Sequence, residues 1–285
     1  MNKLSLLLLI FFAQTCAQQN YLRELEPMAG LPSKLKEVSG LELADNGYFW
    51  VIEDSGNQDE IYKINDKGEL RESLEIDHAK NEDWEDLAKD SEGNLYIGDF
   101  GNNKNERDDL VIYKIPKEEL DRKKPNADKI EFRYPQQNDF PPKKDSLYFD
   151  TEGFFHLNGH LYIFTKNRTR PYSGKTLMYR VPDKEGSYEA EFLGALFLCE
   201  DQNRCSVTSA DISPDGKTIA LLSYGLVFLL TDFTAPDFSN STIKIVDLKT
   251  NTQIESVCFA NDKTLIVADE KNPFGGQTLY KYIMD

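Results

Sequence analysis

Histidine and cysteine are scarce in this chain, which contains three and four of them among 285 residues. No Cys-x-x-Cys pair and no Cys/His spacing of a zinc site is present, and the histidines lack the His-Glu-x-x-His arrangement of zinc proteases. The Gly-x-Ser-x-Gly nucleophile elbow is also missing, and Ser-Gly-Lys-Thr at 173–176 lacks the first glycine of a phosphate-binding loop. The sequence therefore carries none of these zinc, serine-hydrolase or nucleotide-binding signatures.

Basic residues are outnumbered, with 33 Lys and Arg against 49 Asp and Glu and a formal net charge of -16. A strongly acidic surface repels phosphate backbones and anionic lipid headgroups, which argues against nucleic acids and peripheral membrane surfaces as partners. Cationic ligands and divalent metals are favoured instead, and an acidic surface that serves solubility alone is the alternative. The hydrophobic content of 40%, with 12% aromatic residues, predicts a folded chain with a sizeable core.

The N-terminus carries the longest apolar run, LSLLLLIFF, preceded by the basic MNK and followed by the small and polar AQTCAQQ. This order is typical of a secretory signal, and the run is too short to span a bilayer. We predict a signal peptide over 1–17, cleaved either before Cys16, which would then carry a lipid, or after Ala17. The protein is thus expected to be extracytoplasmic, as a periplasmic or outer-membrane lipoprotein or a secreted protein, with membrane contact only through an N-terminal lipid.

Two further cysteines, Cys199 and Cys205, flank the polar loop EDQNR between predicted strands. In an oxidising compartment they are expected to form a local disulfide, and two free thiols are the alternative. Cys258 lies in a strand pattern and is expected to be a small buried residue.

One pattern recurs five times along the chain and consists of a strand, a tight polar turn and a second strand. The five segments span 38–54, 84–100, 151–166, 208–224 and 254–270. Short antiparallel strands repeated at roughly 40–50 residues are typical of a β-propeller. We therefore predict an all-β fold, a β-propeller with five blades; a sixth, degenerate blade within 105–150 is the alternative.

Each repeat is followed by segments that predict further strands. Third strands are expected at 60–66, 111–117, 176–183, 226–233 and 278–285, and outermost strands at 69–76, 129–135, 188–197 and 241–248. The fifth repeat has no fourth strand, and the segment 20–27 could supply one. Pairing that segment with the last blade would close the ring and remove an exposed edge. Residues 18–285 are thus predicted to form a single propeller domain.

In a propeller, the first strand of each blade begins, and the second ends, at one mouth of the central channel. The residues that should meet there are Ser39 with Asp54, Glu85 with Asp99, Glu152 with Lys166, Ser209 with Ser223, and Glu255 with Asp269. They include six carboxylates and one lysine, and Asn102 and Asp211 lie nearby in the sequence. Unpaired buried charges are costly, so this cluster predicts a bound ligand or metal.

Oxygen ligands without histidine or cysteine are typical of Ca²⁺ or Mg²⁺ sites. The candidate Ca²⁺ ligands are Glu85, Asp99, Glu152 and Glu255. The candidate ligand-binding residues are Asp54, Asp99, Asn102, Lys166, Asp211 and Asp269. Glu85 and Glu152 are the candidate acid–base residues, because like-charged neighbours raise the pKa of a carboxyl group. In the alternative interpretation the carboxylates are structural and cap hairpins, pair with Lys166, or accept backbone hydrogen bonds.

Four motifs carry a resemblance to known families: SGL at 39–41, WED at 84–86, GDFGNN at 98–103 and TEGFF at 151–155. They resemble two groups of extracytoplasmic bacterial propellers, the SdiA-regulated family and the phytase-like family described by an esterase-like activity. The resemblance covers most of the chain after residue 17. It implies the propeller fold and an extracytoplasmic location.

The same resemblance would place Glu85, Glu152 and Glu255 in the channel mouth. A weaker similarity is to calcium-dependent lactonases of the gluconolactonase and paraoxonase type. Glu152, followed by glycine, would match the glutamate that binds Ca²⁺ in those enzymes. The asparagine ligands of the lactonases have no counterpart here, since Lys166 and Ser223 occupy the corresponding strand ends.

Two functions from different classes follow from these observations. The first is a ligand-binding or interaction module that uses its acidic channel mouth to bind a small molecule, Ca²⁺ or an envelope protein. The second is a Ca²⁺-dependent hydrolase of phosphoesters or lactones that uses the same carboxylates.

Overall fold

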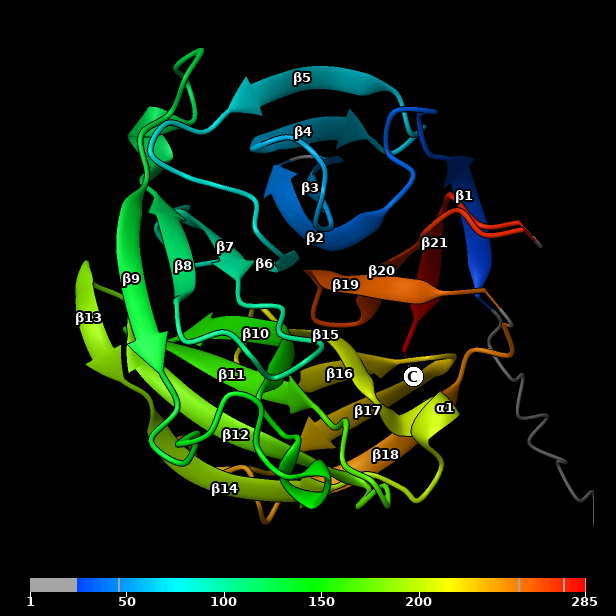
Figure 1. The fold of residues 1–285 in the computed structure, drawn as a ribbon. Coiled ribbons are helices and arrows are strands. Elements are labelled where there is room, and N and C mark those ends of the chain that lie inside the picture. The colour runs from blue at the N-terminus through cyan, green and yellow to red at the C-terminus, as the bar shows by residue number, and fades with distance from the viewer. Residues whose placement is uncertain (1–24, 46, 251, 274, 285) are drawn as a thin grey trace, which may run out of the picture.

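The computed structural model describes residues 25–45, 47–250, 252–273 and 275–284. Its strands form five sheets arranged in a ring, as the ribbon in Figure 1 shows. The predicted five-bladed β-propeller is therefore confirmed, and the described residues contain no sixth sheet.

Each blade has four antiparallel strands, and in the first four blades these follow one another in the chain from the channel outward. The first blade contains β2 (Val38–Asp45), β3 (Tyr48–Glu53), β4 (Glu60–Asn65) and β5 (Leu70–Glu75). The second contains β6 (Trp84–Lys89), β7 (Leu95–Asp99), β8 (Leu110–Ile115) and β9 (Asp128–Arg133). The third contains β10 (Asp150–Leu157), β11 (His160–Lys166), β12 (Lys175–Pro182) and β14 (Glu191–Phe197). The fourth contains β15 (Val207–Ile212), β16 (Ile219–Ser223), β17 (Leu226–Thr231) and β18 (Thr242–Asp247).

The fifth blade is closed by a strand from the other end of the chain. Its strands β19 (Ile254–Asn261), β20 (Thr264–Asp269) and β21 (Thr278–Ile283) are joined by β1 (Glu26–Gly30), which pairs antiparallel with β21. Blue β1 lies beside red β21 in Figure 1. The predicted closure is confirmed, but the closing strand lies at 26–30 instead of 20–27, and residues 20–24 lie outside the described residues.

The predicted single strand at 188–197 is wrong. The chain instead forms β13 (Gly186–Glu189), which pairs in parallel with β9 of the second blade, and then returns to the third blade as β14. The break between them is at Ala190, which is buried and whose N–H donates to the carbonyl of Arg133 (2.9 Å). The connection therefore links two neighbouring blades along their outer edges.

The hydrophobic core consists of five clusters, each built from residues of two neighbouring blades. Trp84, for example, is fully buried between the first and second blades, and Phe100 packs edge-on against Phe154 between the second and third, with ring centroids 5.1 Å apart. The first and second strands are apolar on both faces because each blade is covered by a neighbour on either side. This arrangement holds the first strands side by side around the channel.

Helical structure is limited to two 3-10 turns, η1 (Lys117–Glu119) and η2 (Lys144–Ser146), and to the short α1 (Gln202–Cys205). None of the helices in the described ranges is long and apolar enough to cross a membrane. Cys199 and Cys205 form a disulfide around α1, with their Cα atoms 5.8 Å apart. Cys258 is a buried free thiol. The predicted signal peptide and Cys16 lie outside the described residues.

Candidate functional site

A β-bulge occurs at the same end of the first strand in all five blades. The register slips by one residue between Val38 and Gly40 in β2 and at the equivalent points of β6, β10, β15 and β19. A bulge leaves one residue outside the ladder and redirects its side chain. The bulged residues are Ser39, Glu85, Glu152, Thr208 and Glu255. All five line one cavity at this end of the channel, which we call the mouth cavity.

Glycine follows the bulge where neighbouring first strands approach most closely. A Cβ atom at Gly40 would lie 2.8 Å from the backbone nitrogen of Leu87, and one at Gly153 would lie 2.7 Å from the backbone carbon of Ser209. Real Cβ atoms do not come this close to backbone atoms, so a side chain would push the blades apart. The Ser-Gly and Glu-Gly pairs of the sequence are therefore explained by packing around the channel.

Asp86 occupies the position after the bulge in the second blade. Its fully buried carboxylate accepts hydrogen bonds from the Ser209 hydroxyl (3.0 Å), the Ala210 N–H (3.0 Å) and the Phe154 N–H (3.3 Å). These donors belong to the third and fourth blades. Asp86 thus joins three blades across the channel and has a structural role outside the mouth cavity.

The mouth cavity has a volume of about 210 Å³ and an almost entirely polar lining. Its lining residues are Val38, Ser39, Asp54, Glu85, Asn103, Glu152, Lys166, Arg168, Thr208, Tyr224, Gln253, Glu255 and Glu270. Five of them are carboxylates and two are cationic. Of the residues that the sequence pattern selects, the fold therefore brings together Ser39, Asp54, Glu85, Glu152, Lys166 and Glu255.

Glu152 is neutralised inside the cavity. Its carboxylate lies 2.8 Å from the ammonium group of Lys166 and 3.2 Å from the guanidinium group of Arg168, which also contacts Asp150 (2.6 Å). The Lys166 ammonium group lies 5.2 Å from the centre of the Tyr224 ring. Although burial acts to lower it, the carboxylates of Glu152 and Glu255 raise the pKa of Lys166 well above its usual value. Both cations of the cavity are thus already engaged by carboxylates.

Glu85 has no such partner. Its side chain is only 6% exposed, yet among the described residues none donates a hydrogen bond to its carboxylate and none forms an ion pair with it. Burial raises the pKa of Glu85 well above its usual value, and the neighbouring carboxylates of Glu152, Asp54 and Asp83 raise it further. A buried carboxylate in this environment needs a proton or a bound cation.

Three carboxylates come together around this unpaired group. Asp54, Asp83 and Glu85 each offer an oxygen, and these oxygens all lie within 4.8 Å of one another. We call these residues the acidic triad. Gly101 makes their approach feasible, because a Cβ atom there would overlap the carboxylates of Asp83 and Glu85. Burial, with the nearby Asp54, raises the pKa of Asp83 to about 6. The triad is oxygen-only, as hard divalent cations prefer.

Glu270 faces the same cavity from the fifth blade. Burial, together with the neighbouring Glu255, raises the pKa of Glu270 to about 7. Its carboxylate accepts a hydrogen bond from the side-chain amide of Gln253. The acidic side of the cavity therefore extends from the fifth blade through the first to the second.

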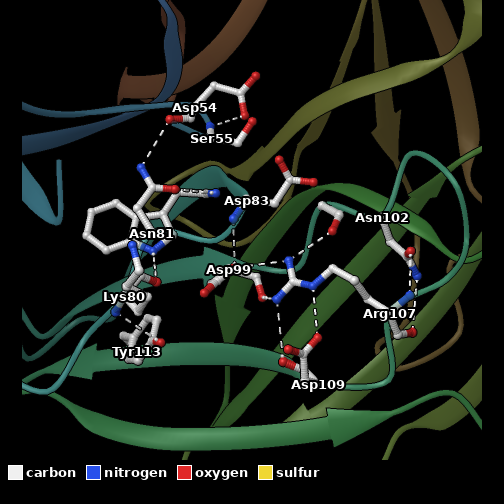
Figure 2. A network of polar contacts seen from close by, with 12 residues as sticks. Asp54, Ser55, Lys80, Asn81, Asp83, Asp99, Asn102, Arg107, Asp109 and Tyr113 are labelled. Atoms are coloured by element: carbon white, nitrogen blue, oxygen red, sulfur yellow. Dashed lines mark hydrogen bonds and ion pairs between the residues drawn. The ribbon is translucent and has the colours of Figure 1, made fainter. Parts of the chain in front are cut away.

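Two predicted site residues of the second blade do not line the mouth cavity. The Asp99 carboxylate accepts hydrogen bonds from the Asp83 N–H (3.0 Å) and the Arg107 guanidinium (3.1 Å), as Figure 2 shows. Asn102 accepts a hydrogen bond from the Arg107 N–H (2.9 Å) and donates to the carbonyl of Phe149 (3.1 Å). Asp99 thus holds the loop after β7 to the segment before β6, and Asn102 holds that loop against the third blade. The neighbouring Asn103 lines the cavity in place of Asn102.

Asp269 and Asp211 also lie away from the mouth cavity. Asp269 is fully buried and accepts hydrogen bonds from the Thr278 N–H (2.7 Å) and the Tyr280 hydroxyl (3.0 Å) within its own blade. Asp211 accepts a hydrogen bond from the Phe259 N–H (2.6 Å) and lines a different cavity at the hairpin end of the channel. The expected placement of these two carboxylates at the mouth was therefore wrong.

In the fourth blade the expected pair is displaced by one residue. Ser209 and Ser223 are fully buried inside the sheet, whereas Thr208 and Tyr224 line the mouth cavity. Every blade has the bulge, but the turn between β15 and β16 leaves 213–218 unpaired, whereas the turn between β6 and β7 leaves only 90–94 unpaired. A count based on the spacing of the other blades therefore selects the wrong neighbour. Asp83 was missed for another reason: it precedes β6 and lies outside the repeated pattern. Its place directly before the Trp-Glu-Asp motif was the available signal.

No protein-family model and no curated protein matches the chain. Among solved structures, the PQQ-bound aldose sugar dehydrogenase of Streptomyces coelicolor is similar over 91% of this chain and 98% of its own, with a TM-score of 0.52 and 8% identity. A gluconolactonase of Xanthomonas campestris matches 87% of this chain and 72% of its own, with a TM-score of 0.48 and 10% identity.

A virginiamycin B lyase of Staphylococcus aureus, solved with quinupristin, matches 87% of this chain with a TM-score of 0.44 and 16% identity. The present chain spans 66% of that protein's length. At such identities the likeness shows the β-propeller fold alone. The finer resemblance to the SdiA-regulated and phytase-like families stays a prediction.

Proposed function

We propose that this protein is a binding module that holds a small cation in its mouth cavity, with Ca²⁺ bound by the acidic triad. The observation that carries the proposal is the Glu85 carboxylate, which is buried and unpaired among the described residues while Asp54 and Asp83 approach it. A cation bound among these three carboxylates would offset the cost of burying Glu85.

The spacing of the triad is compatible with a calcium site. Ca²⁺ binds oxygens at about 2.3–2.6 Å, so two oxygens on one ion lie up to about 5 Å apart. The separation of at most 4.8 Å within the triad is compatible with that arrangement. Mg²⁺ binds at about 2.0–2.1 Å and requires a tighter, octahedral set of ligands. Calcium takes six to eight oxygens, so positions would remain for water or an oxygen-bearing ligand in the cavity.

The predicted ligand set changes in this proposal. Asp99 is withdrawn because Arg107 neutralises it, and Glu152 is withdrawn because Lys166 and Arg168 do. Glu255 lines the cavity from the fifth blade. Because it lies near Lys166, we do not include it among the calcium ligands. Asp54 and Asp83 replace them beside Glu85.

The proposal is tested by thermal unfolding and calorimetric titration of the protein with Ca²⁺ and with EDTA. At one hundred times the dissociation constant, a ligand that binds only the folded state stabilises it by about 2.7 kcal/mol. We expect Ca²⁺ to raise the melting temperature of the wild type and of Glu72→Gln, an exposed control on β5. Glu85→Gln should lose the effect. A wild type that ignores Ca²⁺, or a calcium effect that persists unchanged in Glu85→Gln, would remove the triad as the site.

A second candidate function is hydrolysis of lactones or phosphoesters. It is favoured by the presence of Lys166, Glu152 and Tyr224 in the same cavity as the triad, because proton-transfer groups beside a metal ion are the usual components of a hydrolytic site. Assays of a lactone and a phosphomonoester with Ca²⁺ distinguish the two functions. Activity that Glu152→Gln abolishes while Ca²⁺ still binds would indicate an enzyme, and calcium binding without turnover would leave a binding module.

The location outside the cytoplasm remains part of the proposal. It is supported by the signal-like segment at 1–17 and by the Cys199–Cys205 disulfide, since disulfides persist mainly in oxidising compartments. Mass spectrometry of the membrane-associated protein would reveal a lipid on Cys16. A mature chain that begins at Gln18 would instead place the protein free in its compartment, where its partner is a small molecule or an envelope protein.

A further inference from the structure

A second cavity lies at the opposite end of the channel, among the hairpin turns that connect first and second strands. We call it the hairpin-end cavity. It has a volume of about 720 Å³, and residues of all five blades contribute to it, from Glu42 in the first to Phe259 in the fifth. A cavity of this size is within the usual range for organic ligands.

Glu42, Asp211 and Lys89 line this cavity, and we call these three residues the floor. Glu42 is 5% exposed and Asp211 is 8% exposed. The Lys89 ammonium group lies 3.6 Å from Oε1 of Glu42 and also donates to the carbonyl of Leu43. Oε1 of Glu42 accepts in addition the N–H of Leu43 (2.7 Å). Among the described side chains, Lys89 is thus the ion-pair partner of Glu42 alone.

The second oxygen of Glu42 has no partner. Among the described residues none donates a hydrogen bond to Oε2, although the side chain is almost entirely buried and borders the cavity. Asp211 accepts hydrogen bonds only from backbone N–H groups, those of Phe259 and Ile212, and pairs with no cation in the described ranges. Burial raises the pKa of both carboxyl groups, and the nearby Glu42 carboxylate raises that of Asp211 further. Carboxylate oxygens of Glu42 and Asp211 can therefore still accept hydrogen bonds from a positively charged donor.

The rest of the lining is mixed in character. Apolar side chains also line the cavity, among them Leu43, Leu157, Ile212, Pro214 and Phe259. The lining includes four more acidic residues, Asp90, Glu92, Asp183 and Asp215, as well as Lys114 and His156. A compact metal ion at the two carboxylates would make no contact with these apolar side chains. A cation attached to a hydrocarbon chain would pair with the carboxylates of Glu42 and Asp211, and its chain would contact the apolar side chains.

We propose that the hairpin-end cavity binds an alkyl primary amine, with its ammonium group at Glu42 and Asp211 and its methylene chain against Leu43, Leu157 and Phe259. Three N–H donors on one ammonium group suit carboxylate oxygens that lie on two strands. The contact is charge-assisted and shielded from water, so it is stronger than an exposed ion pair. The amine comes either from a free diamine or from a lysine side chain of a partner protein.

Titration calorimetry with three probes tests the site: the diamine cadaverine, pentanediol of the same length, and a blocked Ala-Lys-Ala peptide. We expect cadaverine or the peptide to bind at least about tenfold more tightly than the diol, since only an amine supplies the charge. Tighter binding of the peptide assigns the amine to a partner protein, and tighter binding of cadaverine assigns it to a free diamine. Equal binding of the diol, or no saturable binding of either amine, overturns the proposal.

Two variants locate the site. Glu42→Gln keeps an acceptor for the Leu43 N–H and removes the charge, so amine binding should weaken about tenfold or more. Glu85→Gln, in the mouth cavity, should leave amine binding unchanged, and Glu42→Gln should leave Ca²⁺ binding unchanged. Amine binding that Glu85→Gln weakens and Glu42→Gln does not would overturn the proposal. The comparison of amine with diol on the wild type decides the question even if Glu42→Gln fails to fold.

Discussion

The ammonium group of Lys166 lies 2.8 Å from the carboxylate of Glu152, and each side chain is only 6% exposed. This contact divides the mouth cavity into a neutralised side and an acidic side. Lys166 and Arg168 are engaged by Glu152 and Asp150, so neither cation remains for Glu85. The acidic triad stays uncompensated for that reason.

Replacing Lys166 by methionine should destabilise the protein by about 3 kcal/mol, because it leaves the buried Glu152 without its main partner. The value is at the lower end for a buried pair, since Arg168 still contacts Glu152. Chemical denaturation measures the loss, and the exposed Lys175→Met serves as control. A loss no larger than that of the control would mean that the pair contributes nothing to the stability of the folded chain.

The close approach of first strands gives a second prediction. Gly153→Ala should cost at least about 2 kcal/mol of unfolding free energy, because its Cβ would lie 2.7 Å from the backbone of Ser209. Gly30→Ala, which would meet nothing within 4 Å, should change stability by less than about 0.5 kcal/mol. Equal effects of the two substitutions would contradict the packing around the channel.

The pKa of Asp83 gives a prediction about pH. It is raised from 3.8 to about 6 by burial and by Asp54, so between these values the folded chain binds a proton that the unfolded chain releases. Stability conferred by the protonated group is present below pH 4 and is lost as the pH rises through 6. In EDTA, Asp83→Asn should therefore gain stability relative to wild type as the pH rises from about 4 to 7.

The exposed Asp237 is the matched control for that experiment. Hydrogen bonds from Ser239 lower the pKa of Asp237, so it titrates below the same pH window. Asp237→Asn should show no relative gain between pH 4 and 7. Urea unfolding at several pH values measures both differences, and a flat or reversed profile for Asp83→Asn would refute the placement of its carboxylate in a shielded, acidic site.

The hydrogen bonds of Asp86 give a fourth prediction. Asp86→Ala removes the acceptor of donors in two other blades, at Phe154, Ser209 and Ala210. Each buried donor left unsatisfied costs about 1–3 kcal/mol, so a total loss of at least about 3 kcal/mol is expected. Denaturant unfolding measures it, with the exposed Asp128→Ala as control. A loss below 1 kcal/mol would indicate that water replaces the carboxylate.

Inner strands were predictable because their signals are local. An apolar strand, a turn such as Asp-Asn-Gly or Pro-Asp-Gly, and a second apolar strand are encoded by adjacent residues. The outer strand at 188–197 was less predictable, since β13 pairs with β9 of another blade and the signal for that pairing is not local. The closing strand was expected from the missing fourth strand of the last blade, although its position shifted to 26–30.

The candidate site was predicted only in part. The pattern selected Glu85 and Glu152 at the channel mouth because the end of a strand can be located from the local repeat. It selected Asp99 and Asp269 incorrectly, because alternation along β7 and β20 points these side chains away from the cavity. Asp83 was not selected, because it lies in the loop before β6 and not in a repeat.

The sequence alone indicated the propeller repeat, the inner strands of each blade and the acidic character of the channel mouth, because periodicity, turn residues and charge are properties of neighbouring positions. The tertiary structure decided which carboxylates share a cavity and which are neutralised. A bulge displaces the register by one residue and thereby changes the direction of a side chain. The partners of Glu85 and Glu152 come from strands and loops that only the closed ring brings together, so no local pattern could show that one is paired and the other is not.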